Sequence, residues 1–163
     1  WNRTTISFAA ALGFLVNGMT QPFIGYMFDR LGGRRVITTG LAIMGVAAVC
    51  LSFTFHFLFL VFVFSLVLST ALSGPSLTNT MAMISKWFRA KRATAVSINS
   101  IGTSMGGLIL VPFAMYFMQA TNWRLTWAAL GLVMLVLAVP LCLIFLRNDP
   151  SAKGSLPDGE LDI

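Results

Sequence analysis

Ion pairing is the chemistry that the charged residues of this chain favour most. Asp29 is the only acidic residue before position 149, and Arg30, Arg34 and Arg35 follow it closely. They belong to a short segment between two long apolar runs, residues 25–35, which we name the charged turn. In so apolar a chain, charges this dense must lie at a membrane surface or in a buried ion-pair network.

The position of Asp29 predicts that it needs a partner. It falls near the C-terminal end of an apolar run, where the helix dipole disfavours an acid by roughly 0.3–1 kcal/mol. We expect it to pair with a nearby cation, Arg30 or Arg34, or with the N-terminus of another helix. Gly32 and Gly33 permit the positive φ of a tight turn.

Residues for enzymatic or metal chemistry are scarce. His56 is the only histidine, so a Ser–His or Cys–His pair has little to build from. Cys50 and Cys142 lie in apolar runs, too far apart for a metal signature. Gly32 and Gly33, followed by arginine, do not form a phosphate loop. We therefore expect no enzyme activity, no cofactor and no metal site.

The composition indicates a membrane protein. Of the 163 residues, 57% are hydrophobic and 10% are charged, whereas soluble domains carry about 25% charged residues. A bilayer admits helices or closed barrels, because it offers backbone groups no water. The apolar runs are long and lack the alternation of barrel strands, so the expected fold is all-α and polytopic.

The lengths of the apolar runs predict five transmembrane helices in one bundle, residues 1–146. Each run approaches the roughly 20 residues that cross a bilayer as a helix. The remainder, residues 147–163, is polar and rich in proline and glycine, and is predicted to be a flexible cytoplasmic tail or the start of a central loop. The five spans are expected at about 4–28, 36–54, 57–84, 93–119 and 125–146.

The basic residues predict the orientation of the bundle in the cell membrane. Nine of the eleven lie on one side of the expected spans and only Arg3 and Arg124 on the other. By the positive-inside rule, the larger set is cytoplasmic, together with the tail. Because the charge of +6 lies in turns rather than on one basic face, we do not expect nucleic-acid binding. The cytoplasmic set is Arg30, Arg34, Arg35, Lys86, Arg89, Lys91, Arg92, Arg147 and Lys153.

Polar residues inside the expected spans are candidates for a solute pathway. A polar face in a bilayer turns toward other helices or toward a water-filled cavity. The alternative interpretation is hydrogen bonding between helices. The pathway candidates are Asn17, Gln21, Ser69, Ser73, Asn79, Asn99 and Thr103, with Thr20, Ser76 and Ser104 nearby. In addition, Gly102, Gly106 and Gly107 form a small-residue pattern that predicts close helix packing.

The charged turn resembles the signature between the second and third helices of the major facilitator superfamily, Gly-x-x-x-Asp-Arg-x-Gly-Arg-Arg/Lys. The chain departs from it at Gly33, where the family usually has a basic residue. A second stretch, from Lys86 to Pro112, resembles the family's fourth-to-fifth-helix region. Within the family, the sequence is similar to the monocarboxylate and oxalate–formate transporter type. The residues that carry the first match are Gly25, Asp29, Arg30, Gly32, Arg34 and Arg35.

This resemblance implies a secondary transporter that works by alternating access. The chain corresponds to helices two to six, and its partners are the bilayer, a small solute or ion, the first helix and a C-terminal half of six helices. In the family, the motif's aspartate and arginines form a cytoplasmic ion-pair network that meets the other half and breaks during the cycle. The alternative is a non-transporting membrane scaffold or assembly module.

Overall fold

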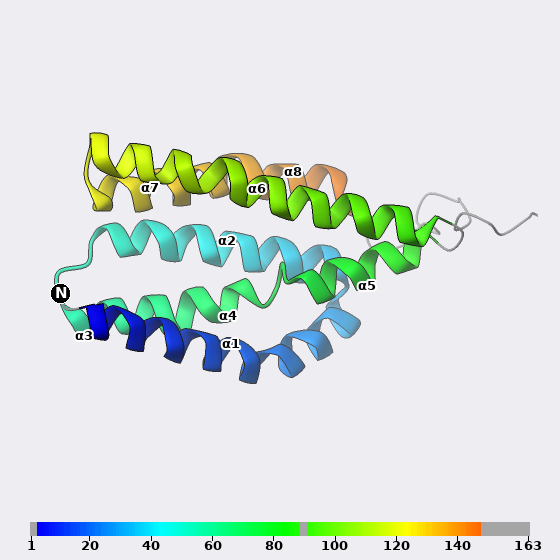
Figure 1. Ribbon diagram of the computed structural model, residues 1–163. Coiled ribbons are helices and arrows are strands. Elements are labelled where there is room, and N and C mark those ends of the chain that lie inside the picture. Colours follow the sequence, from blue (N-terminus) through cyan, green and yellow to red (C-terminus); the bar gives the residue numbers. More distant parts are fainter. Residues whose placement is uncertain (1–2, 89–90, 148–163) are drawn as a thin grey trace, which may run out of the picture.

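The computed structural model describes residues 3–88 and 91–147, and within these ranges it is all-α with no strand. The described residues form five helical rods (Figure 1). Three rods are single helices, and the third and fifth are composite, with π-helical stretches η1 and η2. The elements are α1 (Arg3–Leu31), α2 (Gly33–Ser52), α3 (Phe57–Val61), η1 (Phe62–Leu68), α4 (Ser69–Leu72), α5 (Leu77–Trp87), α6 (Arg92–Ala120), α7 (Trp123–Val133), η2 (Met134–Ala138) and α8 (Val139–Phe145).

Successive rods run in opposite directions, so their connections gather at two ends of the bundle (Figure 1). The α1–α2 turn, the end of α5, the start of α6 and the end of α8 share one end, which we name the basic end. Its described basic residues are Arg30, Arg34, Arg35, Lys86, Lys91, Arg92 and Arg147. The predicted tail, apart from Arg147, lies outside the described residues.

Four of the rods in the described residues are long and apolar enough to cross a membrane. They are α2, the third rod (Phe57–Trp87), α6 and the fifth rod (Trp123–Phe145). The remaining rod, α1, has 29 residues, which is ample length for a span. Its middle is more polar than that of the others because of Asn17, Thr20 and Gln21.

α2 is the central helix of the bundle. In Figure 1 it lies between α1 and α4 on one side and α6 and α7 on the other. Its closest neighbour is α7, which approaches it where two glycines face each other. A Cβ atom on Gly131 would lie 2.7 Å from the carbonyl oxygen of Gly45 and 2.8 Å from Cγ2 of Val49. Side chains at these glycines would force the two helices apart, so we name this contact the α2–α7 seam.

α6 is the peripheral helix. It has no buried residue, although it is 29 residues long. The hydrophobic core lies among the other rods, in one cluster at the basic end and one toward the opposite end. The first cluster contains Phe28, Val36, Ile37 and Met83, and the second contains Ala47, Leu51 and Val63.

Prolines lie at two of the irregular points of the composite rods. Pro75 lies in residues 73–76, where the third rod is not helical, and we name this segment the helix break. Proline lacks the N–H that continues a helix and its ring displaces the carbonyl four residues earlier. Pro140 lies two residues after the end of η2, whose wide turns agree with the same displacement of the carbonyl four residues before a proline. Pro22 and Pro112 lie inside continuous α-helices.

Candidate functional site

Polar side chains of α1 bind the third rod close to the helix break. The amide of Asn17 donates from Nδ2 to the carbonyl oxygen of Ser69 at 2.9 Å and to Oγ of Ser73 at 3.0 Å. Thr20 Oγ1 lies 3.1 Å from the same Ser73 hydroxyl. One turn further, Gln21 Nε2 donates to Oγ of Ser76 at 3.0 Å. Together these contacts form a continuous polar interface between two rods.

Asn79 donates hydrogen bonds to two backbone carbonyl oxygens at the helix break. Its Nδ2 donates to the carbonyl oxygens of Ser73 and Gly74, each at 3.0 Å. Ser73 is fully buried and Asn79 is 6% exposed, so these bonds form away from solvent. Because an unmet carbonyl in hydrocarbon costs several kcal/mol, Asn79 makes the break tolerable inside a membrane. Ser76 begins α5 as its N-cap.

Five of the seven pathway candidates therefore meet in one polar interface: Asn17, Gln21, Ser69, Ser73 and Asn79. Each makes a hydrogen bond between or within rods. Asn17 and Ser69 also border a cavity of about 160 Å³ between α1 and the third rod. Hydrogen bonding and pathway lining can thus coexist at this interface, and the pathway role stays a prediction.

The two other pathway candidates, Asn99 and Thr103, lie on α6 and away from this interface. Thr103 Oγ1 donates to the carbonyl oxygen of Asn99 in its own helix, at 3.0 Å. Asn99 Nδ2 is covered yet has no hydrogen-bond partner within the described part of the chain. A buried amide without a partner is uncommon in folded proteins, so this donor is suited to a group from elsewhere.

The glycines chosen from the α6 pattern face open space. No atom of the described residues would lie within 4 Å of a Cβ atom added at Gly102, Gly106 or Gly107. Gly25 of the charged turn is equally open. The close packing predicted for the three α6 glycines stays a prediction, because the described rods do not fill the space beside them.

In the charged turn, the arginines do not pair with Asp29. Asp29 is exposed, and within residues 3–88 and 91–147 no cation lies within ion-pair distance of it. The Arg30 guanidinium lies 5.2 Å from the ring centre of Tyr26. Arg34 donates from Nη2 to the carbonyl oxygen of Leu143 at the end of α8. The acid thus remains available at the surface of the basic end.

Glycines make the charged turn as tight as it is. Gly32 is the single residue between α1 and α2, and its φ of 85° is the positive value expected for glycine. Gly33 is helical instead and is buried. A Cβ atom there would lie 2.6 Å from the Phe28 ring and 3.2 Å from Met83 Sδ. Phe28 thus occupies the space that the family's basic side chain would need at this position.

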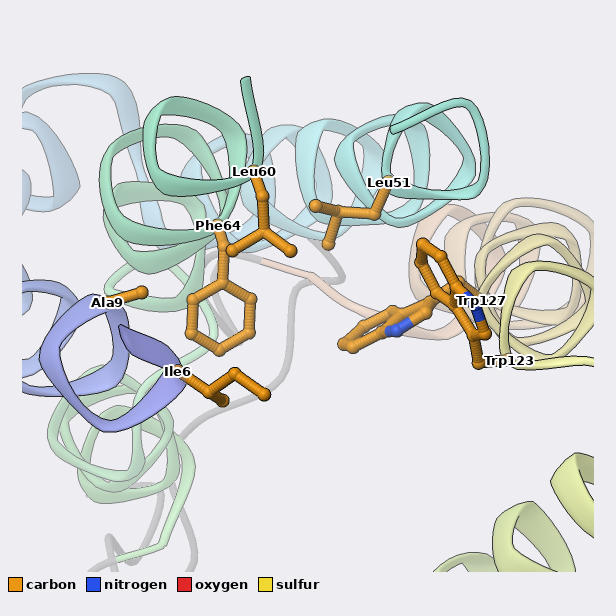
Figure 2. Close-up of a pocket in the computed structure, with 7 residues that line it drawn as sticks. All are labelled: Ile6, Ala9, Leu51, Leu60, Phe64, Trp123 and Trp127. Carbon is orange, nitrogen blue, oxygen red and sulfur yellow. The ribbon is translucent and has the colours of Figure 1, made fainter. Parts of the chain in front are cut away.

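An aromatic cavity of about 450 Å³ lies at the end opposite the basic end. Figure 2 shows Phe64 and Ile6 facing Trp123 and Trp127 across it. The Phe64 and Trp127 rings meet edge to face, with centres 6.3 Å apart. No pathway candidate lines this cavity. Its lining is Ile6, Ala9, Leu51, Leu60, Phe64, Trp123 and Trp127.

Comparison with known protein families decides the classification. The model of the Major Facilitator Superfamily matches residues 1–161 of the chain. The chain belongs to this superfamily. The matched range includes the charged turn.

Individual members of the superfamily match the chain over most of its length. The chain is 29% identical over 161 residues to the uncharacterized MFS-type transporter YcxA of Bacillus subtilis, covering 94% of this chain and 38% of that protein. It is 33% identical over 146 residues to a fujikurins efflux protein of Gibberella fujikuroi, covering 86% and 30%. It is 24% identical over 164 residues to human monocarboxylate transporter 14, covering 99% and 31%. The chain thus spans about a third of the length of these superfamily members.

Some residues that hold this superfamily bundle together escaped sequence reasoning. Ser65 is fully buried and donates to the carbonyl oxygen of Ala9 at 2.7 Å, which ties η1 to α1. Its spacing to Ser69 and Ser73, at steps of four, was the available signal. Gly40 lies against the helix break, where a Cβ atom would be 2.9 Å from the carbonyl oxygen of Ala71. No sequence pattern distinguished Gly40 from the other glycines.

Proposed function

We propose that the chain is part of a secondary active transporter that moves a small solute by alternating access. Membership in the Major Facilitator Superfamily supports transport rather than catalysis. In this proposal the basic end faces the cytoplasm and the protein resides in the cell membrane, in keeping with the positive-inside rule. Since superfamily relatives are about three times as long, further helices complete the solute path.

The observation that carries the proposal is that Asp29 has no ion-pair partner among residues 3–88 and 91–147. Three arginines follow it within the charged turn, yet Arg30 lies over Tyr26 and Arg34 binds the end of α8. A carboxylate near the C-terminal end of α1 also opposes the dipole of its own helix. Asp29 is therefore stabilised by any cation or helix N-terminus that another part of the transporter brings to the basic end.

A contact of this kind acts as a conformational switch. A charge-assisted hydrogen bond contributes about 1.5–3 kcal/mol, which corresponds to about a ten- to hundredfold bias between two states. When the partner helix moves away, Asp29 is solvated and the bias disappears. Gly25, one turn before Asp29 on α1, leaves room for that helix to approach. Arg35 is exposed and adds positive charge at the same end.

The polar interface supplies a candidate wall for the solute path. Broken helices in transporters place polar groups near the middle of the membrane, and the helix break lies within the third rod. Asn17 and Ser69, which border the small cavity beside α1, are the residues we assign to the wall. The remaining polar groups at the break hold the wall in shape through their hydrogen bonds.

Replacement of Asp29 tests the switch. Asp29→Asn in the reconstituted protein is expected to lower uptake of a panel of radiolabelled small organic acids into proteoliposomes by about tenfold or more. Asp149→Asn removes the same charge from the segment after the last rod and serves as the matched control. Uptake that is equal in the two variants contradicts the switch role, provided both reach the membrane in equal amounts.

The orientation is tested separately. In a background with Cys50 and Cys142 replaced by serine, single cysteines at Arg35 and His56 are labelled in intact cells with a membrane-impermeant maleimide. We expect labelling at position 56 and none at position 35 until the cells are opened. The reverse pattern contradicts a cytoplasmic basic end.

A further inference from the structure

A groove at the basic end carries an inference independent of the solute path. It lies between the end of α5 and the end of α8 and has a volume of about 260 Å³. Its lining includes Ile84, Trp87, Phe88, Phe145, Leu146 and Arg147. Five of these side chains are apolar or aromatic and one is a cation. The groove therefore has two chemically distinct parts, a hydrocarbon wall and a basic rim.

The wall of the groove suits an acyl chain. The side chain of Phe145 is 75% exposed and that of Phe88 is 39% exposed, so both present ring surface to whatever fills the groove. The one polar group on the wall, Nε1 of Trp87, already donates to the carbonyl oxygen of Arg147 at 3.2 Å. A polar solute would find no further donor along this wall. An acyl chain carries no polar group, so its burial against this wall leaves no hydrogen bond unmade.

The rim of the groove suits an anion. Arg147 lines the groove directly and its side chain is exposed. The described part of the basic end carries six further basic residues and the single acid Asp29. Clusters of Lys and Arg at helix ends attract acidic phospholipids by about 1 kcal/mol per residue. Trp87, which also lines the groove, is of a residue type that is enriched at the level of the headgroups.

We propose that the α5–α8 groove binds an acidic phospholipid, with an acyl chain against Trp87 and Phe145 and the phosphate at Arg147. The occupant carries both hydrocarbon and negative charge, which is what the two parts of the groove complement. The groove is lined by other residues than those of the charged turn, although Arg34 of that turn binds the same end of α8 through the carbonyl oxygen of Leu143. The lipid site holds the ends of the third and fifth rods together.

Trp87 provides a direct readout of this site. Replacement of Trp1, Trp123 and Trp127 by phenylalanine leaves Trp87 as the only indole of the chain. The protein is reconstituted into phosphatidylcholine vesicles with a minor fraction of either dibrominated phosphatidylglycerol or dibrominated phosphatidylcholine. Brominated chains quench the fluorescence of an indole that they touch. We expect phosphatidylglycerol to reach Trp87 with about fivefold preference.

Substitutions at the rim decide whether Arg147 is responsible. Arg147→Gln should abolish the preference and Arg147→Lys should retain most of it. Arg30→Gln, which removes the same charge from the same end on α1, should leave the preference intact. Circular dichroism and gel filtration show whether each variant keeps its fold. Free inorganic phosphate should not reduce quenching if the ligand is a lipid.

Several results would overturn the lipid site. Equal quenching by the two brominated lipids would show that the groove takes hydrocarbon without regard to charge. Equal effects of Arg147→Gln and Arg30→Gln would reduce the preference to the general charge of the surface. Absence of quenching by both lipids would mean that protein, rather than lipid, covers Trp87.

Discussion

The glycines of the α2–α7 seam and the glycines of α6 have opposite surroundings. At Gly131, a Cβ atom would lie within 3 Å of three atoms of α2, two of them in the backbone. At Gly102 and Gly106, the same added atom would meet nothing within 4 Å. Yet only the α6 glycines show the spacing that predicts close helix packing. Glycine spacing therefore shows that another helix could pack closely against α6. It does not show whether a helix of the described part does so.

The same contrast holds for the amides. Asn79 closes the helix break with two hydrogen bonds, whereas Asn99 on α6 has an amide nitrogen with no partner in the described ranges. Stability is thus concentrated where α1, α2, α7 and the third rod meet. α6 contributes surfaces and donors that are open to other partners. Three substitutions probe this division, from the largest expected effect to the smallest.

Gly131→Ala should have the largest effect. The added methyl group would meet the carbonyl oxygen of Gly45 and the backbone nitrogen of Val49, neither of which can move alone. We expect a loss of about 3 kcal/mol in the free energy of unfolding, at the upper end for overpacked sites, measured by denaturation in detergent micelles. Gly18→Ala, where no atom lies within 4 Å, is the matched control. A similar response from both variants would contradict the tight seam.

Asn79→Ala should have the second largest effect. The substitution leaves the carbonyl oxygens of Ser73 and Gly74 without their donor in a buried setting. The expected loss is about 1–2 kcal/mol, measured in the same assay. Asn99→Ala removes an amide of the same size from α6, and we expect a change below about 0.5 kcal/mol. If Asn99→Ala proves the more damaging of the two, the helix break does not depend on Asn79.

Gly106→Ala should have the smallest effect, and of opposite sign. Alanine is favoured over glycine inside a helix by up to about 1 kcal/mol, and the space beside Gly106 is open. The expected result is a small rise in the unfolding temperature of the chain. A fall instead would sharpen the comparison, since it would mean that another helix packs on α6 at this position. Repeating the measurement with Gly102→Ala maps how far such a contact extends.

The sequence was sufficient to predict the class of fold. Apolar runs of spanning length can form only helices in a bilayer, so the all-α bundle and the place of the charged turn followed from composition and spacing. The residues of the charged turn also led to the superfamily, which the family comparison confirmed. Gly32 has the positive φ that its position in the turn indicated.

Other features depend on contacts that no local pattern encodes. Sequence position marked Asn79 as a polar residue inside a span, but it could not show that its amide binds the carbonyl oxygens of Ser73 and Gly74. Arg34 was a candidate partner for Asp29. In the described residues it instead donates a hydrogen bond to the carbonyl oxygen of Leu143 at the end of α8, 109 positions further along the chain. Long-range pairings of this kind are fixed by the packing of rods, not by the order of residues.

The helix break also bears on how the chain enters a membrane during synthesis. α5 has 11 residues and the part before the break ends at Leu72, so neither part reaches the roughly 20 residues that cross a bilayer alone. The third rod must therefore insert as one segment. Asn79 belongs to that segment and inserts with it. Asn17 and Gln21 lie on α1, which is synthesised earlier. For the hydrogen bonds around the helix break, Asn17, Gln21 and Asn79 thus reach the membrane before, or together with, the groups that accept from them.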